Sequence, residues 1–419
     1  MWRVFIISVI SLFGLNLVEA SAQRSEKIVS LKNIYRQIDE AIAQSPIYVE
    51  EYKTKLKKQK DLFYDETDAE KKLMDGMMLF DMYRSFNNDS ALFYLGRCIT
   101  MADELGFQEL AGQARAKMAR QCSNSGMYVE AKELLDQVNP SLLTKEGKTD
   151  YYEACSHLCG EIANYSLLPN VKTRFFDMQH RYRDSLETVA DETSPKLLEA
   201  RIWKLLDENR MEEALEVSDY WINRVGIGTR EDAMASFYRH IVYAQMGDNI
   251  MVRYWLGKSA LADIKCAVMD QASLITLAEK ANIDGDTERS YRYIRFTWEC
   301  NNAFNTRMRS SQISPVLNVI ERNYQDEVNR NTRFLSIASV VFTSLTLLLF
   351  LVLFYVYHQK RQLSKTKKEL QDANEKLSDS NFRLKRMNDW VTKCNNELFD
   401  INEKLKQENA PHEVSQEHL

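Results

Sequence analysis

Helix-breaking residues are scarce in this sequence, which contains 6 Pro and 13 Gly among its 419 residues. Between them the chain is rich in Leu, Ala, Glu, Lys, Met and aromatic residues, which suit helix. Hydrophobic residues make up 45% of the chain, an ordinary share for folded protein. The sequence therefore predicts an almost entirely α-helical protein, most of which is folded.

Charge of either sign is not in large excess, because the formal net charge at pH 7 is only −5. So small a net charge excludes a nucleic-acid-binding surface spread over the whole chain. The sequence also lacks a Gly-rich phosphate loop, a nucleophile elbow and the motifs of protein kinases. We therefore expect neither an enzyme nor a bound cofactor.

Two short clusters contain ligand-type residues but lack the spacing of a metal site. In Cys155-Ser156-His157-Leu158-Cys159, a helix turns His157 away from the face that the two cysteines share. Asp284-Gly285-Asp286 starts like a calcium loop, but Thr287-Glu288-Arg289 does not continue the ligand pattern. We interpret the first cluster as helix packing and the second as a turn with a helix cap, and we expect no metal site.

The first apolar run lies near the N-terminus, where Arg3 is followed by the uncharged residues 4–18 and then by Ala20-Ser21-Ala22. Small residues after such a run are typical of a signal-peptidase site. Residues 1–22 are therefore predicted to be a signal peptide that is cleaved before Gln23. An uncleaved N-terminal anchor is the alternative, and in either case the chain beyond residue 22 is exported.

The second apolar run, residues 334–357, contains 24 residues without a charge. That length is enough to cross the hydrocarbon layer of a membrane, which is about 30 Å thick, with some tilt. Phe334 at one end and Tyr355 and Tyr357 at the other lie where interfacial aromatic residues belong. This segment is predicted to be a single transmembrane helix.

The charges beside this segment indicate its orientation. Basic residues before it are accompanied by acidic ones, whereas five basic residues come after it, namely Lys360, Arg361, Lys365, Lys367 and Lys368. The positive-inside rule places the C-terminus in the cytoplasm, in agreement with the signal peptide. We therefore expect a single-pass inner-membrane protein with a periplasmic N-terminal domain and a cytoplasmic C-terminus.

Six of the seven cysteines fall in the part that is predicted to be exported, where disulfides are permitted. Their spacings are irregular, and no pairing can be deduced from them. We favour small core residues over disulfides. The six are Cys98, Cys122, Cys155, Cys159, Cys266 and Cys300.

Turn-forming residues recur within residues 23–312 at intervals of about 38 to 43 residues, which indicates a repeat. Two apolar helical patterns flank each turn, as in a helical hairpin. One hairpin cannot bury its own apolar face, so neighbouring hairpins are expected to stack into a solenoid. The turns are Asn87-Asn88, Ser125-Gly126, Leu168-Pro169, Asn209-Arg210, Gly247-Asp248 and Gly285-Asp286.

The clearest unit, residues 197–216, resembles a tetratricopeptide repeat (TPR). That family places a small residue where Ala214 stands, because the two helices of a unit approach closely there. Ala91 and Ala131 occupy comparable places, but Phe175 stands where the third unit should have a small residue. The third unit is therefore divergent, or its register differs. The resemblance implies a TPR-like solenoid.

Stacked hairpins expose a continuous concave face, and such faces bind extended peptides or partner helices. We therefore expect a protein or peptide ligand on the exported repeats. Most aromatic residues are expected to pack between helices, and some to line the groove. These residues include Tyr151, Tyr152, Tyr238, Tyr243, Tyr254, Tyr291 and Tyr293.

A seven-residue ladder of apolar residues within residues 358–409 predicts a coiled coil. Asparagine occurs four residues after most of these positions, so if the leucines occupy d positions, the a positions are almost all Asn. A buried Asn specifies register and dimeric state but costs stability. The predicted seam consists of Leu363, Leu370, Leu377, Leu384, Val391, Leu398, Leu405, Asn374, Asn381, Asn388, Asn395 and Asn402.

The sequence does not decide which heptad positions the seam residues occupy, since the leucines can also occupy a positions. The d positions are then Thr366, Ala373, Ser380, Met387, Cys394, Ile401 and Glu408. Both frames predict a parallel homodimer, because the membrane segment tethers both chains at the same end, and a lone polar helix is the alternative. Residues 313–333 are expected to form a juxtamembrane helix, and residues 410–419 a disordered tail.

The order of these parts resembles a family of membrane-anchored TPR regulators of Gram-negative bacteria, most of which are known only as a domain of unknown function. The resemblance extends to about residue 409. Members usually continue into a helix-turn-helix-like region that is suspected of binding DNA. Residues 410–419 are too short for such a module, so direct DNA binding by this chain is not expected. Within residues 25–105 the matching positions are Tyr48, Lys53, Leu56, Tyr83 and Asp89-Ser90-Ala91.

These features predict a membrane-anchored TPR sensor or adaptor. It would bind a protein or peptide outside the inner membrane and relay its state through a dimeric coiled coil, either as a truncated transcriptional regulator or as a complete adaptor. The alternative is a periplasmic TPR scaffold that assembles envelope proteins without signalling, in which the coil serves only to dimerise the protein.

Overall fold

The computed structural model describes the backbone of residues 2–408 and the side chains of residues 27–306 and 308–406. Helices dominate this part of the chain, and none of its residues lies in a strand. The predicted all-α fold is confirmed. The elements are α1 (Trp2–Asp65), α2 (Ala69–Tyr83), α3 (Asn88–Glu104), α4 (Gln108–Asn124), α5 (Tyr128–Asp136), η1 (Pro140–Leu142), α6 (Lys145–Tyr165), α7 (Pro169–Val189), α8 (Pro195–Asp207), α9 (Met211–Ile222), α10 (Arg230–Met246), α11 (Asn249–Lys265), α12 (Ala272–Ile283), α13 (Thr287–Phe304) and α14 (Arg307–Glu408).

All six predicted turns lie at a junction between two helices, and Asn88 and Pro169 are the first residues of α3 and α7. At the turn between α10 and α11, Gly247 adopts a left-handed backbone with a φ of 78°, and the Asp248 side chain caps α11. The Asp286 side chain caps α13 in the same manner. The interpretation of residues 284–286 as a turn with a helix cap is thereby confirmed.

The small residues that the TPR resemblance requires lie at close helix contacts. Ala91, Ala131 and Ala214 have no exposed surface, and each belongs to a different apolar cluster. In the third hairpin, formed by α6 and α7, Phe175 is half-buried. The close approach is instead made by Gly160 of α6, where a Cβ would collide with a side chain of α7. Ala91, Ala131 and Ala214 are each the fourth residue of their helix, whereas the fourth residue of α7 is Lys172, so the register differs from the predicted one and the third hairpin also lacks the small residue.

The cysteines pack as small residues of the core. Five of those in the repeats are buried and Cys266 is half-buried, and all six are free thiols. Burial raises the pKa of Cys98 and Cys122 to about 12, so both thiols stay protonated at neutral pH. Their role as core residues is confirmed.

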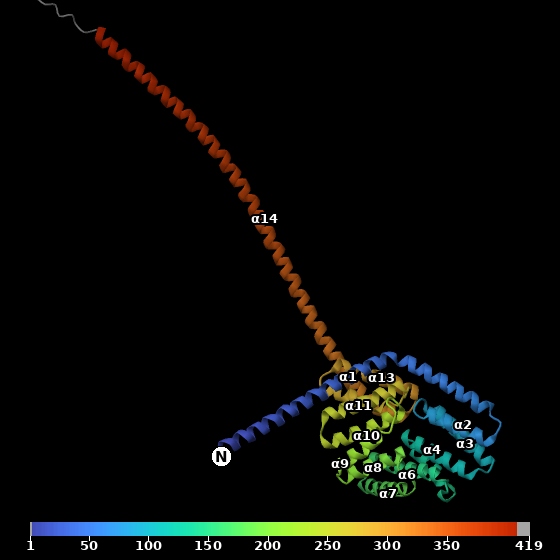
Figure 1. Cartoon of the computed structure of the whole chain (residues 1–419). Coiled ribbons are helices and arrows are strands. Elements are labelled where there is room, and N and C mark those ends of the chain that lie inside the picture. The colour runs from blue at the N-terminus through green and yellow to red at the C-terminus, as the bar shows by residue number, and fades with distance from the viewer. Residues whose placement is uncertain (1, 409–419) are drawn as a thin grey trace, which may run out of the picture. The chain divides into compact units, whose positions relative to one another are not determined.

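Helix α1 bridges the first and the last hairpins (Figure 1). Ile34 and Ile38 pack in one apolar cluster with residues of α11, α12, α13 and α14. Further along α1, Leu56 and Phe63 pack with the first hairpin, α2 and α3. Gly257 of α11 permits this arrangement, because a Cβ there would lie 2.4 Å from the Ile34 side chain. The solenoid is therefore closed by its own N-terminal helix.

Loops from the two ends of the repeats also meet. The three hydrogen bonds are Met269 N–H to Ser85 O at 2.7 Å, Asn87 Nδ2 to Ala303 O at 3.0 Å, and Asn305 Nδ2 to Asp89 Oδ2 at 2.6 Å. We call this group, formed by residues 84–89, 269 and 303–305, the closing contact. It joins the first hairpin to the loop from which α14 starts.

The start of α14 belongs to the repeat domain, the compact unit that ends at Val328. Ile313, Leu317 and Ile320 are buried at helical spacing in the cluster that also holds α1 and α11. Farther along, the Tyr324 ring stacks on a tyrosine ring of α13, with the ring centroids 4.2 Å apart. The core of the repeats therefore holds the beginning of this helix firmly.

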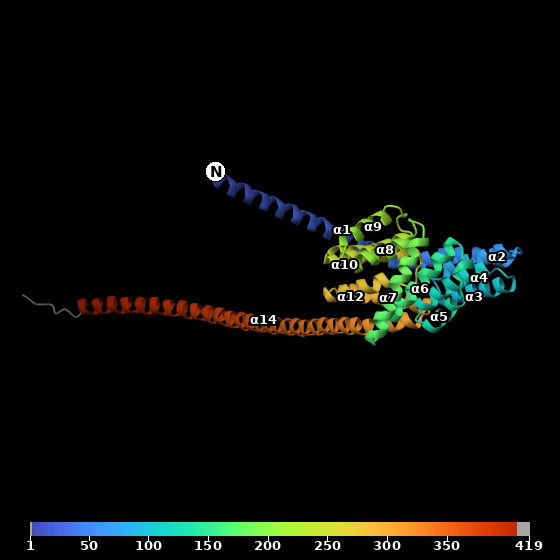
Figure 2. The ribbon, with the colours of Figure 1, turned by 90° about the horizontal axis from the view of Figure 1, so that it is seen from below.

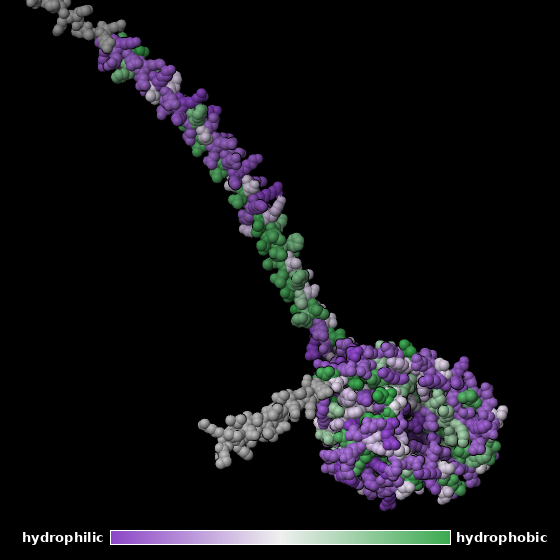
Figure 3. All heavy atoms as spheres, viewed as in Figure 1, coloured by the Kyte–Doolittle hydropathy of each residue, from purple (hydrophilic) through white to green (hydrophobic). Residues whose placement is uncertain are grey.

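The second unit starts at Asn329 and is described as the rest of α14, an unbroken helix to Glu408 (Figure 2). The large side chains of residues 334–357 are exposed, from Phe334 at 72% to Tyr357 at 66%. Figure 3 shows this stretch as a hydrophobic band on α14. Among the residues searched, α14 is the one helix long and apolar enough to cross a membrane by length and composition.

Two predicted segments remain untested. Helix α1 starts at Trp2 and runs past the predicted cleavage site before Gln23, but the side chains before residue 27 are not described. The signal peptide therefore stays a prediction. The predicted disordered tail, residues 410–419, lies outside the described residues.

Candidate functional site

A cavity of about 1390 Å³ lies inside the repeat domain, between α4, α6, α8, α10 and the start of α14. Charged and amide side chains dominate its lining, and a few aromatic rings, among them Phe176, Trp203 and Phe237, contribute to it. Small-molecule sites usually measure roughly 300–1000 Å³. This cavity therefore has room for an extended polar ligand and is the candidate ligand site.

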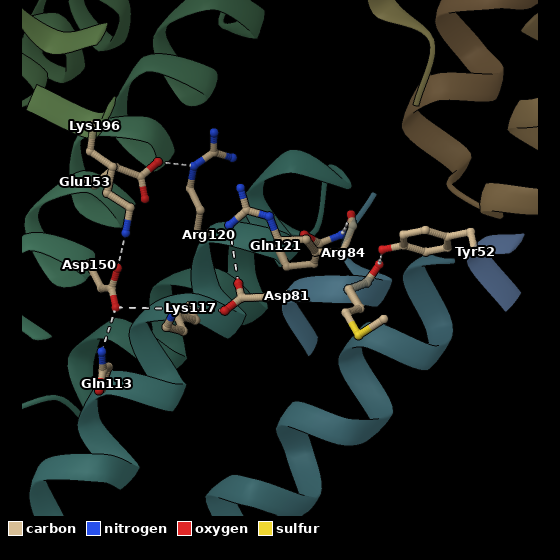
Figure 4. Close-up of polar contacts among 11 residues, drawn as sticks. Tyr52, Asp81, Arg84, Gln113, Lys117, Arg120, Gln121, Asp150, Glu153 and Lys196 are labelled. Carbon is tan, nitrogen blue, oxygen red and sulfur yellow. Dashed lines mark hydrogen bonds and ion pairs between the residues drawn. The ribbon is translucent and has the colours of Figure 1, made fainter. Parts of the chain in front are cut away.

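One side of the cavity carries a row of alternating charges, shown in Figure 4. The row, which we call the charge ladder, runs from Lys196 through Asp150, Lys117 and Asp81 to Arg84. Lys196 forms an ion pair with Asp150, and Lys117 Nζ lies 3.7 Å from the other oxygen of this carboxylate. Asp81 lies 3.5 Å from Lys117 Nζ and 3.6 Å from Arg84 Nη1. Three cations therefore share two carboxylates in this row.

A second ion pair, between Arg120 and Glu153, lies beside the charge ladder (Figure 4). Burial alone would raise the pKa of Glu153, but Arg120 and Lys196 outweigh burial and hold this pKa below its usual value. Burial also opposes the charge on Arg120, and Glu153 outweighs it and raises the pKa of Arg120. Both side chains are therefore ionised at neutral pH.

Glu199 of α8 lines the cavity near this pair. Burial raises its pKa, Arg120 opposes this effect, and the charge on Glu153 adds to it. Tyr238 of α10 contributes to the same region, and burial followed by the charge on Glu199 raises its pKa well above the usual value. Glu199 therefore adds a further carboxyl group beside the charge ladder.

Two further ion pairs line the cavity near the start of α14. Arg230 pairs with Asp263, whose pKa burial raises to about 6 although Arg230 lowers it. Arg309, in the first turn of α14, contacts Asp270 twice. Its Nε lies 2.7 Å from Oδ1, and its Nη2 donates to Oδ2 at 2.9 Å. The cavity wall therefore includes the helix that leaves the repeat domain.

His157 lines the cavity, whereas the two cysteines beside it do not. Its Nδ1 lies 2.8 Å from Ser123 Oγ, and Cys155 and Cys159 are buried. Burial and the charge on Arg120 hold the pKa of His157 well below its usual value, so the ring is neutral at pH 7. The arrangement agrees with the helical spacing, which turns the histidine away from the cysteines.

Charged residues line the cavity more extensively than the aromatic residues that the sequence suggested. Of the seven tyrosines considered, only Tyr238 lines it. The charged residues have a spacing that could have been detected. The pair Arg120–Glu153 joins α4 and α6, the first helices of two successive hairpins, across 33 positions, close to the TPR period of about 34. Opposite charges at this interval were the available signal.

The residues of the predicted coiled-coil seam all lie on the last part of α14. Their side chains are exposed in the single chain, for example Leu363 at 71% and Leu405 at 49%, and so are the asparagines between them. The single chain brings none of them together. The seam therefore stays a prediction about contacts between two copies.

Comparison with known proteins identifies the repeats. Residues 42–315 match the family model of the SusR N-terminal TPR domain, and no curated protein matches the chain. A solved circular tandem repeat protein, with novel repeat topology and enhanced subunit contact surfaces, is similar at 12% identity over 73% of this chain and 74% of that one, with a TM-score of 0.21. The family match confirms the resemblance to TPR regulators, whose repeats generally form non-enzymatic, protein-binding scaffolds.

Proposed function

This chain belongs to the family of the SusR N-terminal TPR domain, and we propose that it is a membrane-anchored sensor or adaptor. Its repeats bind a protein or peptide ligand outside the inner membrane, and α14 relays the bound state to a dimeric coiled coil in the cytoplasm. The proposal rests on the continuity of α14, which runs unbroken from the cavity wall through the apolar stretch to the leucine ladder.

The apolar stretch of α14 supports the membrane anchor. Residues 334–357 carry no charge, and their large side chains are exposed. Burial of a Leu, Val or Phe side chain is worth roughly 1.5–3 kcal/mol, so this many uncovered side chains in water would be strongly unfavourable. A lipid bilayer supplies the missing apolar environment. In this scheme residues 313–333 form the juxtamembrane helix.

The flanking segments support the orientation. The signal peptide predicted in residues 1–22 directs the export of the repeats, and the basic cluster after residue 358 favours the cytoplasm. The repeats, residues 23–312, are then periplasmic, and residues 358–409 are cytoplasmic.

The start of α14 is suited to relaying a change in the cavity. Arg309 lies in the cavity wall, and Ile313 and Ile320 are buried in the core directly after it. In this proposal a displacement of the wall shifts or rotates the start of α14, and the distal part of the helix responds. The leucine and asparagine seam is only marginally stable, so small energies change its register.

The test of the dimer is disulfide cross-linking in membrane vesicles with an added oxidant. Leu370→Cys, Leu377→Cys and Leu384→Cys are introduced singly into a chain that carries Cys394→Ser. We expect cross-linked dimers at all three positions. Asp379→Cys, on the opposite side of the same helix, serves as the matched control and should not cross-link. Equal cross-linking at residues 377 and 379 would refute a defined seam.

The relay can be tested without a ligand by changing the contact between the cavity wall and the start of α14. Asp270→Lys replaces the Arg309–Asp270 pair by two like charges in the cavity wall. A sensor predicts an altered cross-linking pattern at residues 370–384, because α14 moves. If the dimer forms but this pattern is unchanged, the chain is a dimeric periplasmic scaffold and the relay is wrong.

A further inference from the structure

Two cations of the charge ladder lack a carboxylate of their own. Asp150 is already paired with Lys196, and Asp81 is shared between Lys117 and Arg84. The contacts of Lys117 and Arg84 with these carboxylates measure 3.5 to 3.7 Å. Charge-assisted hydrogen bonds normally span about 2.7–2.9 Å. Both cations are therefore loosely held by the two carboxylates of the ladder.

These two cations face the cavity. Lys117 and Arg84 line it together with Arg120 and Gln121, whereas Asp81 does not. The Lys117 side chain is only 16% exposed. A charge that is largely removed from water interacts more strongly with a counter-ion than a charge on an open surface does. The corner between Lys117 and Arg84, whose side chain is 45% exposed, therefore offers two loosely held cations to a negative group.

We propose that this corner of the cavity binds an anionic group of the ligand, a carboxylate or a phosphate, between Lys117 and Arg84. The Arg84 guanidinium can hold such a group with two parallel hydrogen bonds, and the Lys117 ammonium adds a point charge. This assignment rests on the proposed role of the cavity as the ligand site, and it names the chemical class that the cavity selects. The ligand is therefore expected to carry at least one anionic group.

The backbone around Arg84 is held in place, so that the guanidinium is presented from a defined position. Gln121 Nε2 donates to Arg84 O at 3.1 Å and to Asn88 Oδ1 at 2.7 Å. Ser125 Oγ donates to the same Asn88 oxygen at 2.9 Å. Helix α4 therefore positions both Lys117, which it carries, and the loop after Arg84.

The same loop forms one side of the closing contact. Residues 85, 87 and 89 are hydrogen-bonded to residues 269, 303 and 305, and α14 starts two residues after Asn305. An anion that draws Arg84 toward Lys117 acts on this loop directly. Occupancy of the site is thereby transmitted to the start of α14.

The binding test uses the full chain in lipid nanodiscs and isothermal titration calorimetry at low salt. The probes are triglutamate, which supplies carboxylates, inorganic phosphate, and trilysine as the cationic control. We expect triglutamate or phosphate to bind and trilysine not to bind. The probe that binds identifies the anionic group. Absence of binding by both anions would overturn the proposal.

Matched variants locate the site. Lys117→Gln and Arg84→Gln should each weaken anion binding about tenfold or more, because each loses a hydrogen bond to a charged group. Lys117→Arg, which keeps the charge, should restore most of the affinity relative to Lys117→Gln. Lys57→Gln removes an exposed cation of α1 outside the cavity and should change nothing. Equal losses in the Lys57 and Lys117 variants would place binding elsewhere and refute the site.

The cross-linking assay separates this proposal from the proposed function. If no anion binds but Asp270→Lys changes the cross-linking of Leu377→Cys, the relay stands and the anion site is wrong. If anions bind through Lys117 and Arg84 but the seam residues do not cross-link, the site stands and the sensor is wrong.

Discussion

The repeat domain and the distal part of α14 contain similar apolar residues, but these are buried in the first and exposed in the second. In the repeats, Trp221 and Leu197 are each 1% exposed and Ile38 is fully buried. In α14 beyond residue 329, no protein side chain of the described chain covers residues such as Phe350, which is 72% exposed. Apolar composition therefore indicates that a segment must be shielded from water. The surroundings of the segment decide whether protein, lipid or a second chain shields it.

Charges show the same contrast. Beside local pairs, the repeats contain pairs across different helices, such as Arg120 with Glu153 and Arg309 with Asp270. In the distal helix the one described pair, Arg383 with Asp379, joins neighbouring turns and is solvent-exposed. Exposed pairs of this kind contribute little to stability. The distal helix therefore depends on contacts with lipid or with a second chain, whereas the repeats are stabilised by contacts between their own helices.

The largest expected effect tests whether lipid covers the apolar stretch. Leu347→Arg combined with Leu351→Arg should make membrane insertion less favourable by about 5–7 kcal/mol, at roughly 2.5–3.5 kcal/mol for each Arg near the membrane centre. Carbonate extraction of membranes measures this effect, and we expect the double variant to become soluble. Val319→Arg, at an exposed position in the repeat-domain part of α14, is the control and should stay in the membrane fraction. If the double variant also stays there, this stretch is not the anchor.

The next effect tests whether the repeats are stabilised from within. Trp221 is 1% exposed and stacks on Tyr238 with ring centroids 5.7 Å apart. Trp221→Ala should lower the free energy of unfolding by about 3–5 kcal/mol, because it leaves a cavity in a packed core. Urea unfolding monitored by near-ultraviolet circular dichroism measures this loss. The neighbouring Tyr220→Ala, at a position 39% exposed, should cost about 1 kcal/mol or less. Similar losses for the two variants would contradict the tight packing around Trp221.

The third effect is a pH dependence of the repeats. Burial raises the pKa of Asp263 from 3.8 to about 6, so between these values the folded chain binds more protons than the unfolded chain. The stability contributed by this group is therefore complete below about pH 4 and is lost as the pH rises to about 6, by roughly 3 kcal/mol. Asp263→Asn should remove this decrease. Urea unfolding of both chains across this range measures it, and parallel curves would show that the carboxyl does not titrate in this range.

The smallest expected effect tests which heptad positions the asparagines of the coiled coil occupy. If the asparagines occupy a positions, Asn381→Ile together with Asn388→Ile should stabilise the dimer by about 1–3 kcal/mol, since two buried amides are replaced by apolar side chains. The urea dependence of cross-linking at Leu377→Cys measures this gain. Asn396→Ile, outside the seam in either frame, is the control. A gain no larger than the control's would place the leucines at a positions instead.

Features that depend on neighbouring residues were predictable from the sequence. The turn at Gly247-Asp248 was predictable because both residues act within a few positions of themselves, one through its backbone and one as a cap. Ala214 was predictable because a TPR hairpin tolerates only a small side chain there. The apolar stretch was predictable from its length and its lack of charge alone.

Contacts between distant segments were not predictable in this way. Lys27 pairs with Asp248 across 221 positions, and Asn87 reaches Ala303 across 216. No local pattern marks such partners, because they meet only after every intervening hairpin has stacked. The charge ladder was not predicted for the same reason, since its members are ordinary surface-type residues that come from α2, α4, α6 and α8. Only the interval of 33 positions in the neighbouring Arg120–Glu153 pair hints that such charges meet.

The sequence by itself determined the helices, the turns between them, the uncovered apolar segment and the leucine ladder, because period and composition act over a few residues at a time. Only the tertiary structure decided that α1 closes the solenoid, that the cavity is lined by charges, and that Arg309 of α14 lies in its wall. These features depend on which helices meet. That choice is made by the packing of the whole repeat domain and not by any one segment.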